Sequence, residues 1–100
     1  MTTADLGWLW DVLEERRGAS QEDSYTARLL AGGVERIGRK VGEEATETVI
    51  AAVRAGYGEN RAELIGESAD LVYHLLVLLL ASGVGIDEVI GELERRHADR

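Results

Sequence analysis

Apolar residues recur at helical spacing along almost the whole chain. The first group follows the i, i+3, i+4, i+7 pattern of one helix face: Leu6, Leu9, Trp10 and Leu13. The same period predicts further helices over about residues 24–31, 34–55, 60–82 and 87–97. No stretch alternates long enough to predict a strand. Because the connections are short, the pattern predicts an all-α fold, an antiparallel helical bundle, in one domain over residues 1–100.

Two expectations concern helix ends. Gly32 and Gly33 should end the short second helix, because glycine is unfavourable in a helix interior. Asp87 should cap the last helix, because a side-chain oxygen at that position accepts hydrogen bonds from free backbone N–H groups. The remaining breaks are also expected at glycines, between residues 56 and 58 and at 83 and 85.

The helix over residues 60–82 is expected at the centre of the bundle. Between Leu71 and Ala81 it is apolar on nearly every side, which is typical of a buried helix. The rest of a 100-residue chain supplies little cover, so a homodimer or a higher homo-oligomer is expected to complete the bundle. The longest uninterrupted apolar run, Leu75 to Ala81, is far shorter than the ~20 residues that span a bilayer, so no membrane partner is expected.

Acidic residues interrupt the apolar pattern on two helices. The helix over residues 34–55 carries three within an arc of about 100°: Glu43, Glu44 and Glu47. The next helix carries one polar stripe: Glu63, Glu67, Asp70 and His74. A carboxylate that enters an apolar segment is costly to desolvate unless it is paired. Two simpler interpretations stay open: a solvated face with ion pairs such as Lys40–Glu44 for the first group, and an exposed helix end for the second.

Composition narrows the chemistry of these acids. The chain has no cysteine and two histidines, which excludes disulfides and thiolate zinc sites and disfavours zinc generally. Mg²⁺, with Mn²⁺ as an alternative, is therefore the expected partner of converging carboxylates. Basic residues flank the acids and suit a metal-bound polyphosphate: Arg28, Arg36, Arg39 and Lys40. A net charge of −8 argues against a nucleic-acid partner, and the lack of a leader-like N-terminus predicts a cytoplasmic protein.

The acidic motif resembles that of the all-α nucleotide pyrophosphohydrolases of the MazG-like superfamily. It reads EEATE over residues 43–47, followed by ESAD over residues 67–70. The segments SYTARLLAGGVERIGRKVGEEATETVIAA and ESADLVYHLLVLL are similar to the phosphoribosyl-ATP pyrophosphohydrolase family in particular. The resemblance implies Mg²⁺-dependent hydrolysis of phosphoribosyl-ATP to phosphoribosyl-AMP and pyrophosphate, the second step of histidine biosynthesis. Many relatives are fused to a zinc-dependent cyclohydrolase with cysteine ligands, and the absence of cysteine predicts a stand-alone enzyme.

Roles for individual side chains follow from this resemblance. The implied catalytic residues are Glu43, Glu44, Glu47, Glu67 and Asp70. The last four would hold Mg²⁺, whereas Glu43 would orient or deprotonate the attacking water, or act as a further ligand. The expected substrate-binding residues are Lys40, Arg39, Arg28, Ser24, Tyr25 and His74. Ser24 and Tyr25 precede a helix whose N-terminus can receive an anion, and His74 could instead be a hydrogen-bonded core histidine.

Two other functions stay open at this point. A house-cleaning pyrophosphohydrolase that acts on another (deoxy)nucleoside triphosphate would carry the same acidic motif. An acidic helical module that only binds partner proteins would not be stabilised by Mg²⁺ and a nucleotide. A di-iron carboxylate bundle is disfavoured, because it needs two Glu-x-x-His motifs and the chain has none.

Overall fold

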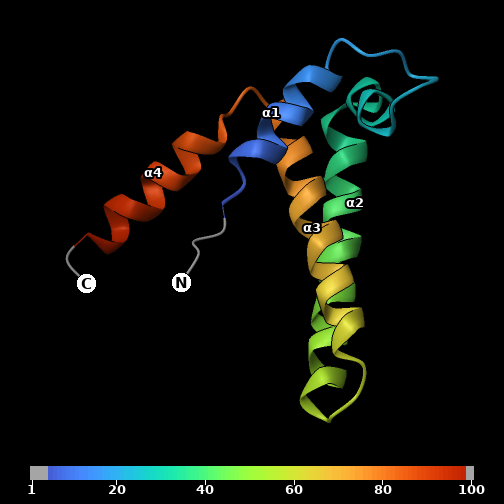
Figure 1. The fold of residues 1–100 in the computed structure, drawn as a ribbon, viewed down its shortest axis with the longest axis vertical. Helices are drawn as coiled ribbons and strands as arrows, with labels where there is room; N and C mark the ends of the chain where they lie inside the picture. The colour runs from blue at the N-terminus through green and yellow to red at the C-terminus, as the bar shows by residue number, and fades with distance from the viewer. Residues whose placement is uncertain (1–4, 99–100) are drawn as a thin grey trace.

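The computed structural model describes residues 5–98, and this range forms four helices and no strand. They are α1 (Gly7–Arg16), α2 (Tyr25–Gly56), α3 (Arg61–Ala81) and α4 (Ile86–His97). α2 and α3 lie side by side as an antiparallel hairpin, α1 packs beside the C-terminal end of α3, and α4 projects away from the hairpin (Figure 1). The predicted all-α helical fold is therefore confirmed.

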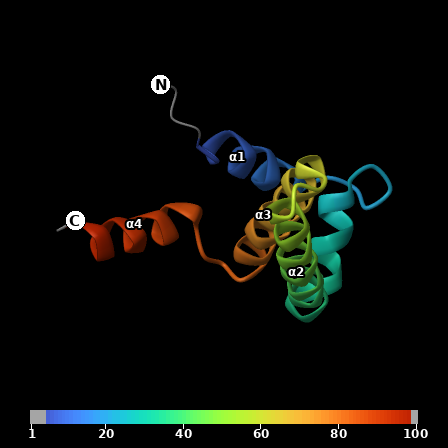
Figure 2. The ribbon, with the colours of Figure 1, turned by 90° about the horizontal axis from the view of Figure 1, so that it is seen from below.

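α2 changes direction at Gly33. This residue has φ 85° and ψ 168°, a backbone conformation open almost only to glycine. Figures 1 and 2 show that the part before Gly33 runs across the direction of the longer part, which follows α3. The predicted break at this glycine is confirmed, and Ser24 caps the first segment by accepting a hydrogen bond from Ala27 N at 3.1 Å. The kink lays the start of α2 against the middle of α3.

Both helices of the hairpin end at a glycine with positive φ. At the end of α2, Gly58 has φ 81° and Glu59 N donates to Arg54 O at 3.1 Å, which is the long bond of a Schellman motif. Gly83, with φ 74°, ends α3 in the same way. Asn60 then caps α3 by accepting from Ala62 N at 3.1 Å. The loop between the two long helices is therefore tightly fixed at both sides.

The start of α4 differs from the expectation. Asp87 was predicted as its cap, but the helix begins at Ile86 and Gly85 occupies the capping position, so that prediction is wrong. Gly85 N donates to Glu88 Oε2 at 2.8 Å, so a side chain inside the first turn satisfies the backbone at the helix start. Asp87 lies in the first turn, where its negative charge is favourable at the positive end of the helix dipole.

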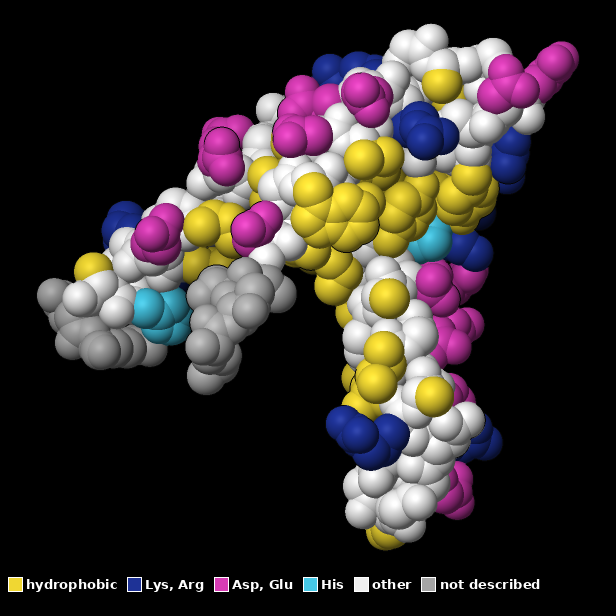
Figure 3. Space-filling model, in the orientation of Figure 1, with side chains coloured by type: hydrophobic (Ala, Val, Ile, Leu, Met, Phe, Trp, Pro, Cys, Tyr) yellow, Lys and Arg dark blue, Asp and Glu magenta, His cyan; other side chains and the backbone are white. Residues whose placement is uncertain are grey.

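The core lies where α1, both segments of α2 and the C-terminal half of α3 meet. Its buried members are Leu13, Leu29, Ile37, Leu76, Val77 and Leu80. Trp10 packs against this cluster, whereas Trp8 is 65% exposed, because the two side chains point to different faces of α1. Figure 3 shows hydrophobic side chains gathered in the angle between the hairpin and the arm formed by α1 and α4.

One apolar side of the hairpin stays uncovered in the single chain. Val49 and Val53 share an apolar side of α2 with Ile37 in the sequence pattern, yet they are 62% and 55% exposed. The reason is that α3 packs on a different face of α2, which carries Ile37, Glu44 and Ala51. This face lies between the apolar side and the acidic side of α2. Leu75 of α3 is likewise 42% exposed, so the expectation that α3 is surrounded on nearly every side is not met by one chain alone.

Among the described residues, α3 is the one helix long and apolar enough to cross a membrane by length and composition alone. The core helix of a protein that does not enter a membrane passes the same test. Four side chains of α3 are buried against the rest of the chain: His74, Leu76, Val77 and Leu80. α3 therefore contributes to the core of the single chain, where it packs against α1 and α2.

A pair of glycine substitutions tests the kink. We expect Gly33→Ala to lower the free energy of unfolding by about 1–3 kcal/mol, because alanine is strained at this φ and ψ. Gly42→Ala is the matched control: Gly42 is exposed within the helical part of α2, nothing obstructs a Cβ, and a gain of about 0.5–1 kcal/mol is expected. Urea unfolding at one fixed protein concentration measures both. Equal effects of the two substitutions would contradict the kink.

Candidate active site

Four carboxylates from the two long helices face one another near the middle of the hairpin: Glu44, Glu47, Glu67 and Asp70. The negative charges of Glu47 and Asp70 act on both Glu44 and Glu67. The Thr48 hydroxyl fixes the two helices at this level, since it lies 2.7 Å from the backbone oxygen of Glu44 and 3.2 Å from that of Glu67. No motif in the sequence points to Thr48, although it follows Glu44 by four residues on the same face.

Glu44 is the deeply buried member of this cluster, with 6% of its surface exposed. Burial raises the pKa of its carboxyl group; His74 and Lys40 oppose that shift, and Asp70 and Glu47 add to it. Its Oε1 atom is sealed from solvent and has no well-directed hydrogen bond, although His74 Nδ1 lies 2.5 Å away. A buried carboxylate in this state is costly to the folded protein.

Glu67 and Glu47 form a second strained contact between the helices. Glu67 Oε2 is sealed from solvent without a donor when both carboxyl groups are ionised. A proton shared with Glu47 supplies the missing donor, and this is the main cause of the raised pKa of Glu67; desolvation and the charges of Glu47, Asp70 and Glu63 contribute further. The helix pair therefore holds like charges close together at this point.

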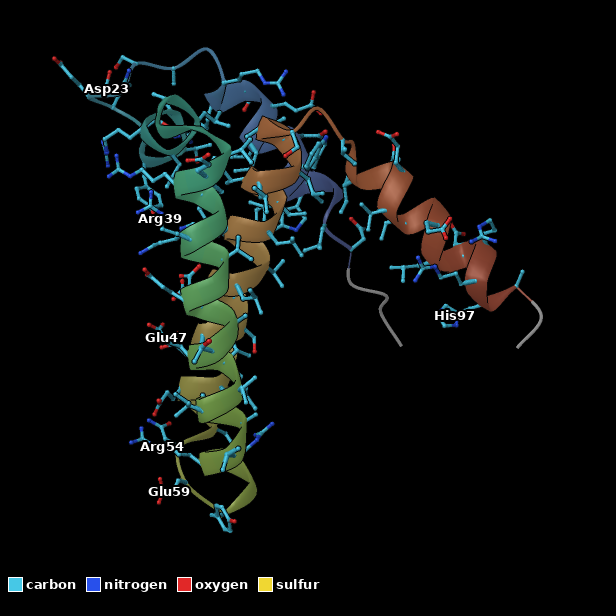
Figure 4. The ribbon with its side chains drawn as sticks, turned by 180° about the vertical axis from the view of Figure 1, so that it is seen from behind. Asp23, Arg39, Glu47, Arg54, Glu59 and His97 are labelled. Carbon is cyan, nitrogen blue, oxygen red and sulfur yellow. The ribbon has the colours of Figure 1, made fainter. Side chains whose placement is uncertain are left out.

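Basic side chains lie beside these acids on the outer edge of α2. Arg36, Arg39, Lys40 and Glu43 line a shallow hollow of about 340 Å³. Lys40 also lowers the pKa of Glu44, so it lies close to the carboxylate cluster. Figure 4 shows Arg39, Glu47 and Arg54 following one another down this edge of the helix. Glu43 thus lies with the basic residues of the hollow and is separate from the sealed carboxylates.

The other expected substrate-binding residues lie around the start of α2. Ser24 is buried and its hydroxyl caps the helix, so that oxygen already has a structural partner. Arg28 donates to Gln21 O at 2.8 Å, and its guanidinium lies 5.8 Å from the centre of the Tyr25 ring. The Tyr25 hydroxyl lies 2.8 Å from His74 Nε2, so this group connects to the carboxylates through the histidine.

His74 is a hydrogen-bonded core histidine, which was one of the two alternatives considered for it. It is 5% exposed and lies between Tyr25 on one side and Glu44 on the other. Thr26 and Tyr73 share a further hydrogen bond beside it. The hydrogen bond between Thr26 and Tyr73 could not be predicted from the sequence pattern, because it depends on the direction of α2 before Gly33.

The cluster has the chemistry of a cation site, although it is not preformed. In residues 5–98, no three acidic or histidine side chains are already arranged to hold a metal ion. The unpartnered Oε2 of Glu67 and the raised pKa values of Glu44 and Glu67 fit a hard divalent ion, which would relieve the repulsion between the carboxylates. Basic groups on the adjacent edge of α2 are suited to phosphate oxygens.

The chain matches one protein family and several individual relatives. A family model described as phosphoribosyl-ATP pyrophosphohydrolase matches residues 7–97. A phosphoribosyl-ATP pyrophosphatase of Erythrobacter litoralis is 58% identical over 85 residues, which are 85% of this chain and 78% of that relative. One of Trichlorobacter lovleyi is 54% identical over 91 residues, or 91% of this chain and 81% of the relative. The histidine biosynthesis bifunctional protein HisIE of Photobacterium profundum is 48% identical over 92% of this chain, which spans 42% of that longer relative.

The raised pKa of Glu67 predicts how stability depends on pH. Because folding raises this pKa above the ordinary value of 4.5, the folded protein binds more protons than the unfolded chain above that pH. The contribution of Glu67 is therefore fully favourable below pH 4.5 and is lost as the pH rises through the raised pKa. In a chelator at about pH 7, we expect Glu67→Gln to melt at a higher temperature than the unsubstituted protein.

The difference should shrink as the pH falls toward about 4, where both proteins carry a neutral group at this position. Thermal unfolding followed by circular dichroism across this pH range measures it. The control is Glu35→Gln, which removes the same charge from an exposed position of α2. A Glu67→Gln protein that is less stable than the control at neutral pH would contradict the strained contact.

Proposed function

Because the chain belongs to the phosphoribosyl-ATP pyrophosphohydrolase family, we propose that it hydrolyses phosphoribosyl-ATP to phosphoribosyl-AMP and pyrophosphate in histidine biosynthesis. The observation that carries this proposal is the meeting of sealed carboxylates with a basic hollow on the same helix pair. Acids alone would repel a triphosphate, and bases alone would bind one without activating water. Together, with a divalent ion, they suit the cleavage of a phosphoric anhydride.

The cofactor of the proposed reaction is Mg²⁺, with Mn²⁺ as an alternative. Its ligands would come from Glu44, Glu47, Glu67 and Asp70, and two of these have a buried oxygen without a partner. When bound, the ion would neutralise phosphate charge and stabilise the pyrophosphate leaving group. The four carboxylates in turn fix the position of the substrate relative to α2 and α3.

The other side chains of the site act on water and phosphate directly. Glu43 lies in the hollow beside Arg39 and Lys40, within reach of a substrate whose phosphates those bases hold. Its carboxylate would orient the attacking water and accept its proton. Arg39 and Lys40 would bind the remaining phosphate oxygens. Arg28 and Tyr25 lie further along the kinked start of α2 and would contact the more distant parts of the nucleotide.

The proposed enzyme is a homodimer that acts in the cytoplasm. The exposed apolar side chains of α2 and α3 include Val49, Val53 and Leu75. They form an apolar side of the hairpin, and its exposure to water is unfavourable. α4 adds a second uncovered face, since Ile90 and Leu93 are exposed and none of its residues is buried. A second copy that packs against these faces would complete the bundle expected from the pattern of α3.

Loss of a metal-holding carboxylate tests the reaction. We expect Glu44→Gln and Asp70→Asn to lower the rate of pyrophosphate release from phosphoribosyl-ATP by about 100-fold or more, because each removes a charge that holds the ion. Glu35→Gln is the control and should be unaffected. The assay measures pyrophosphate in Mg²⁺ and in a chelator. Near-normal turnover in either folded variant would contradict the assignment.

The same assay separates the proposed substrate from the alternatives. Phosphoribosyl-ATP should be cleaved far faster than common nucleoside and deoxynucleoside triphosphates. Faster cleavage of one of the latter would identify a house-cleaning enzyme instead. A module that only binds proteins would release no pyrophosphate, and Mg²⁺ with nucleotide would not raise its melting temperature.

A charge on the apolar side of α2 tests the dimer. We expect Val49→Glu to convert the protein to a monomer in sedimentation equilibrium, because an ionised side chain is costly to bury in an apolar contact. Gln21→Glu adds the same charge in an exposed loop and should leave the dimer intact. An unsubstituted protein that is monomeric, or a Val49→Glu protein that stays dimeric, would contradict this interface.

A further inference from the structure

We propose that His74 is a positioning residue for the metal site: its Nδ1–H group holds Glu44 Oε1 and thereby leaves Glu44 Oε2 to bind the cation. The inference rests on the proposed function, because it assumes that Glu44 is a ligand. It gives His74 a role that acts through Glu44, without contact to the metal or the substrate. His74 and Glu44 are both buried, on α3 and α2, with Nδ1 and Oε1 2.5 Å apart.

The hydrogen-bond partners of His74 assign its tautomer. Nδ1 lies 2.8 Å from the backbone oxygen of Asp70, and a backbone oxygen can only accept, so Nδ1 carries the hydrogen. Nε2 of the neutral ring is then an acceptor, and the Tyr25 hydroxyl at 2.8 Å donates to it. The positive end of the Nδ1–H dipole therefore lies beside Glu44 Oε1, which has no hydrogen-bond partner of its own.

The surroundings hold the ring in this orientation. The Tyr73 ring lies edge-on to His74, with centroids 5.0 Å apart at 87°, and the Tyr25 ring does so at 5.8 Å and 88°. A ring held on two sides and bonded at both nitrogens cannot turn to offer Nε2 to Glu44. Metal ligands are commonly oriented by such supporting groups, and loss of one typically costs about 10- to 100-fold in metal affinity.

Two amide substitutions separate the roles of the two nitrogens. The amide of Asn reaches the place of Nδ1 and can still donate to Glu44, whereas that of Gln reaches the place of Nε2 and can serve only Tyr25. We expect His74→Gln to weaken Mn²⁺ binding by about 10- to 100-fold and His74→Asn to retain most of it. Electron paramagnetic resonance of unbound Mn²⁺, without substrate, measures the affinity.

Thr26→Val is the matched control. It removes the buried hydrogen bond to Tyr73 without touching a carboxylate contact. We expect it to lower the melting temperature of the metal-free protein and to leave Mn²⁺ affinity unchanged. Folded His74→Gln protein with normal Mn²⁺ affinity would overturn the positioning role. An unsubstituted protein that binds no Mn²⁺ would overturn both this role and the metal site of the proposed function.

Nuclear magnetic resonance of the ¹⁵N-labelled unsubstituted protein tests the same point without relying on a variant that folds. The neutral His74 ring should carry its hydrogen on Nδ1, and its signals should shift when Mg²⁺ is added. A ring protonated only on Nε2 would overturn the proposal. If Mn²⁺ binds and is lost in His74→Gln while phosphoribosyl-ATP is not hydrolysed, the positioning role stands and the proposed substrate is wrong.

Discussion

The packing of α2 on α3 forces like charges together, and the rest of the site depends on this contact. The buried face of α2 carries Ile37, Glu44 and Ala51 at intervals of one heptad, so a carboxylate lies between two apolar side chains. Burial of Ile37 and Ala51 stabilises the hairpin, whereas burial of Glu44 opposes it. The fold therefore holds a local electrostatic cost, and the proposed cation would reduce it on binding.

The kink at Gly33 connects this helix pair to the residues before it. Because the chain turns there, Tyr25 and Thr26 reach His74 and Tyr73 in the middle of α3. A straight α2 would carry the same side chains beyond the end of the hairpin. The backbone conformation of Gly33 thus determines which side chains contact His74 beside the buried carboxylate.

Sequence reasoning located the helices well because each has a strong local signal. The capping serine, the glycines after α2 and α3, and the break at Gly33 all act through neighbours along the chain. The cap predicted at Asp87 failed because a glycine followed by Glu88 satisfies the same backbone groups in another way. The exposure of Val49 and Val53 could not be predicted in this way. Helical period shows which side of a helix is apolar, but it does not show which part of that side a neighbouring helix covers.

By itself, the sequence determined the all-α class, the ends of most helices and the family to which the chain belongs. It also placed the acidic residues on two helix faces, because residue spacing fixes direction around a helix axis. Only the tertiary structure decided that Glu44 is buried against His74, that Glu67 meets Glu47, and that Glu43 lies apart among basic residues. These facts depend on the rotation of one helix against another and on the turn at Gly33, and both are set by contacts between residues far apart in the chain.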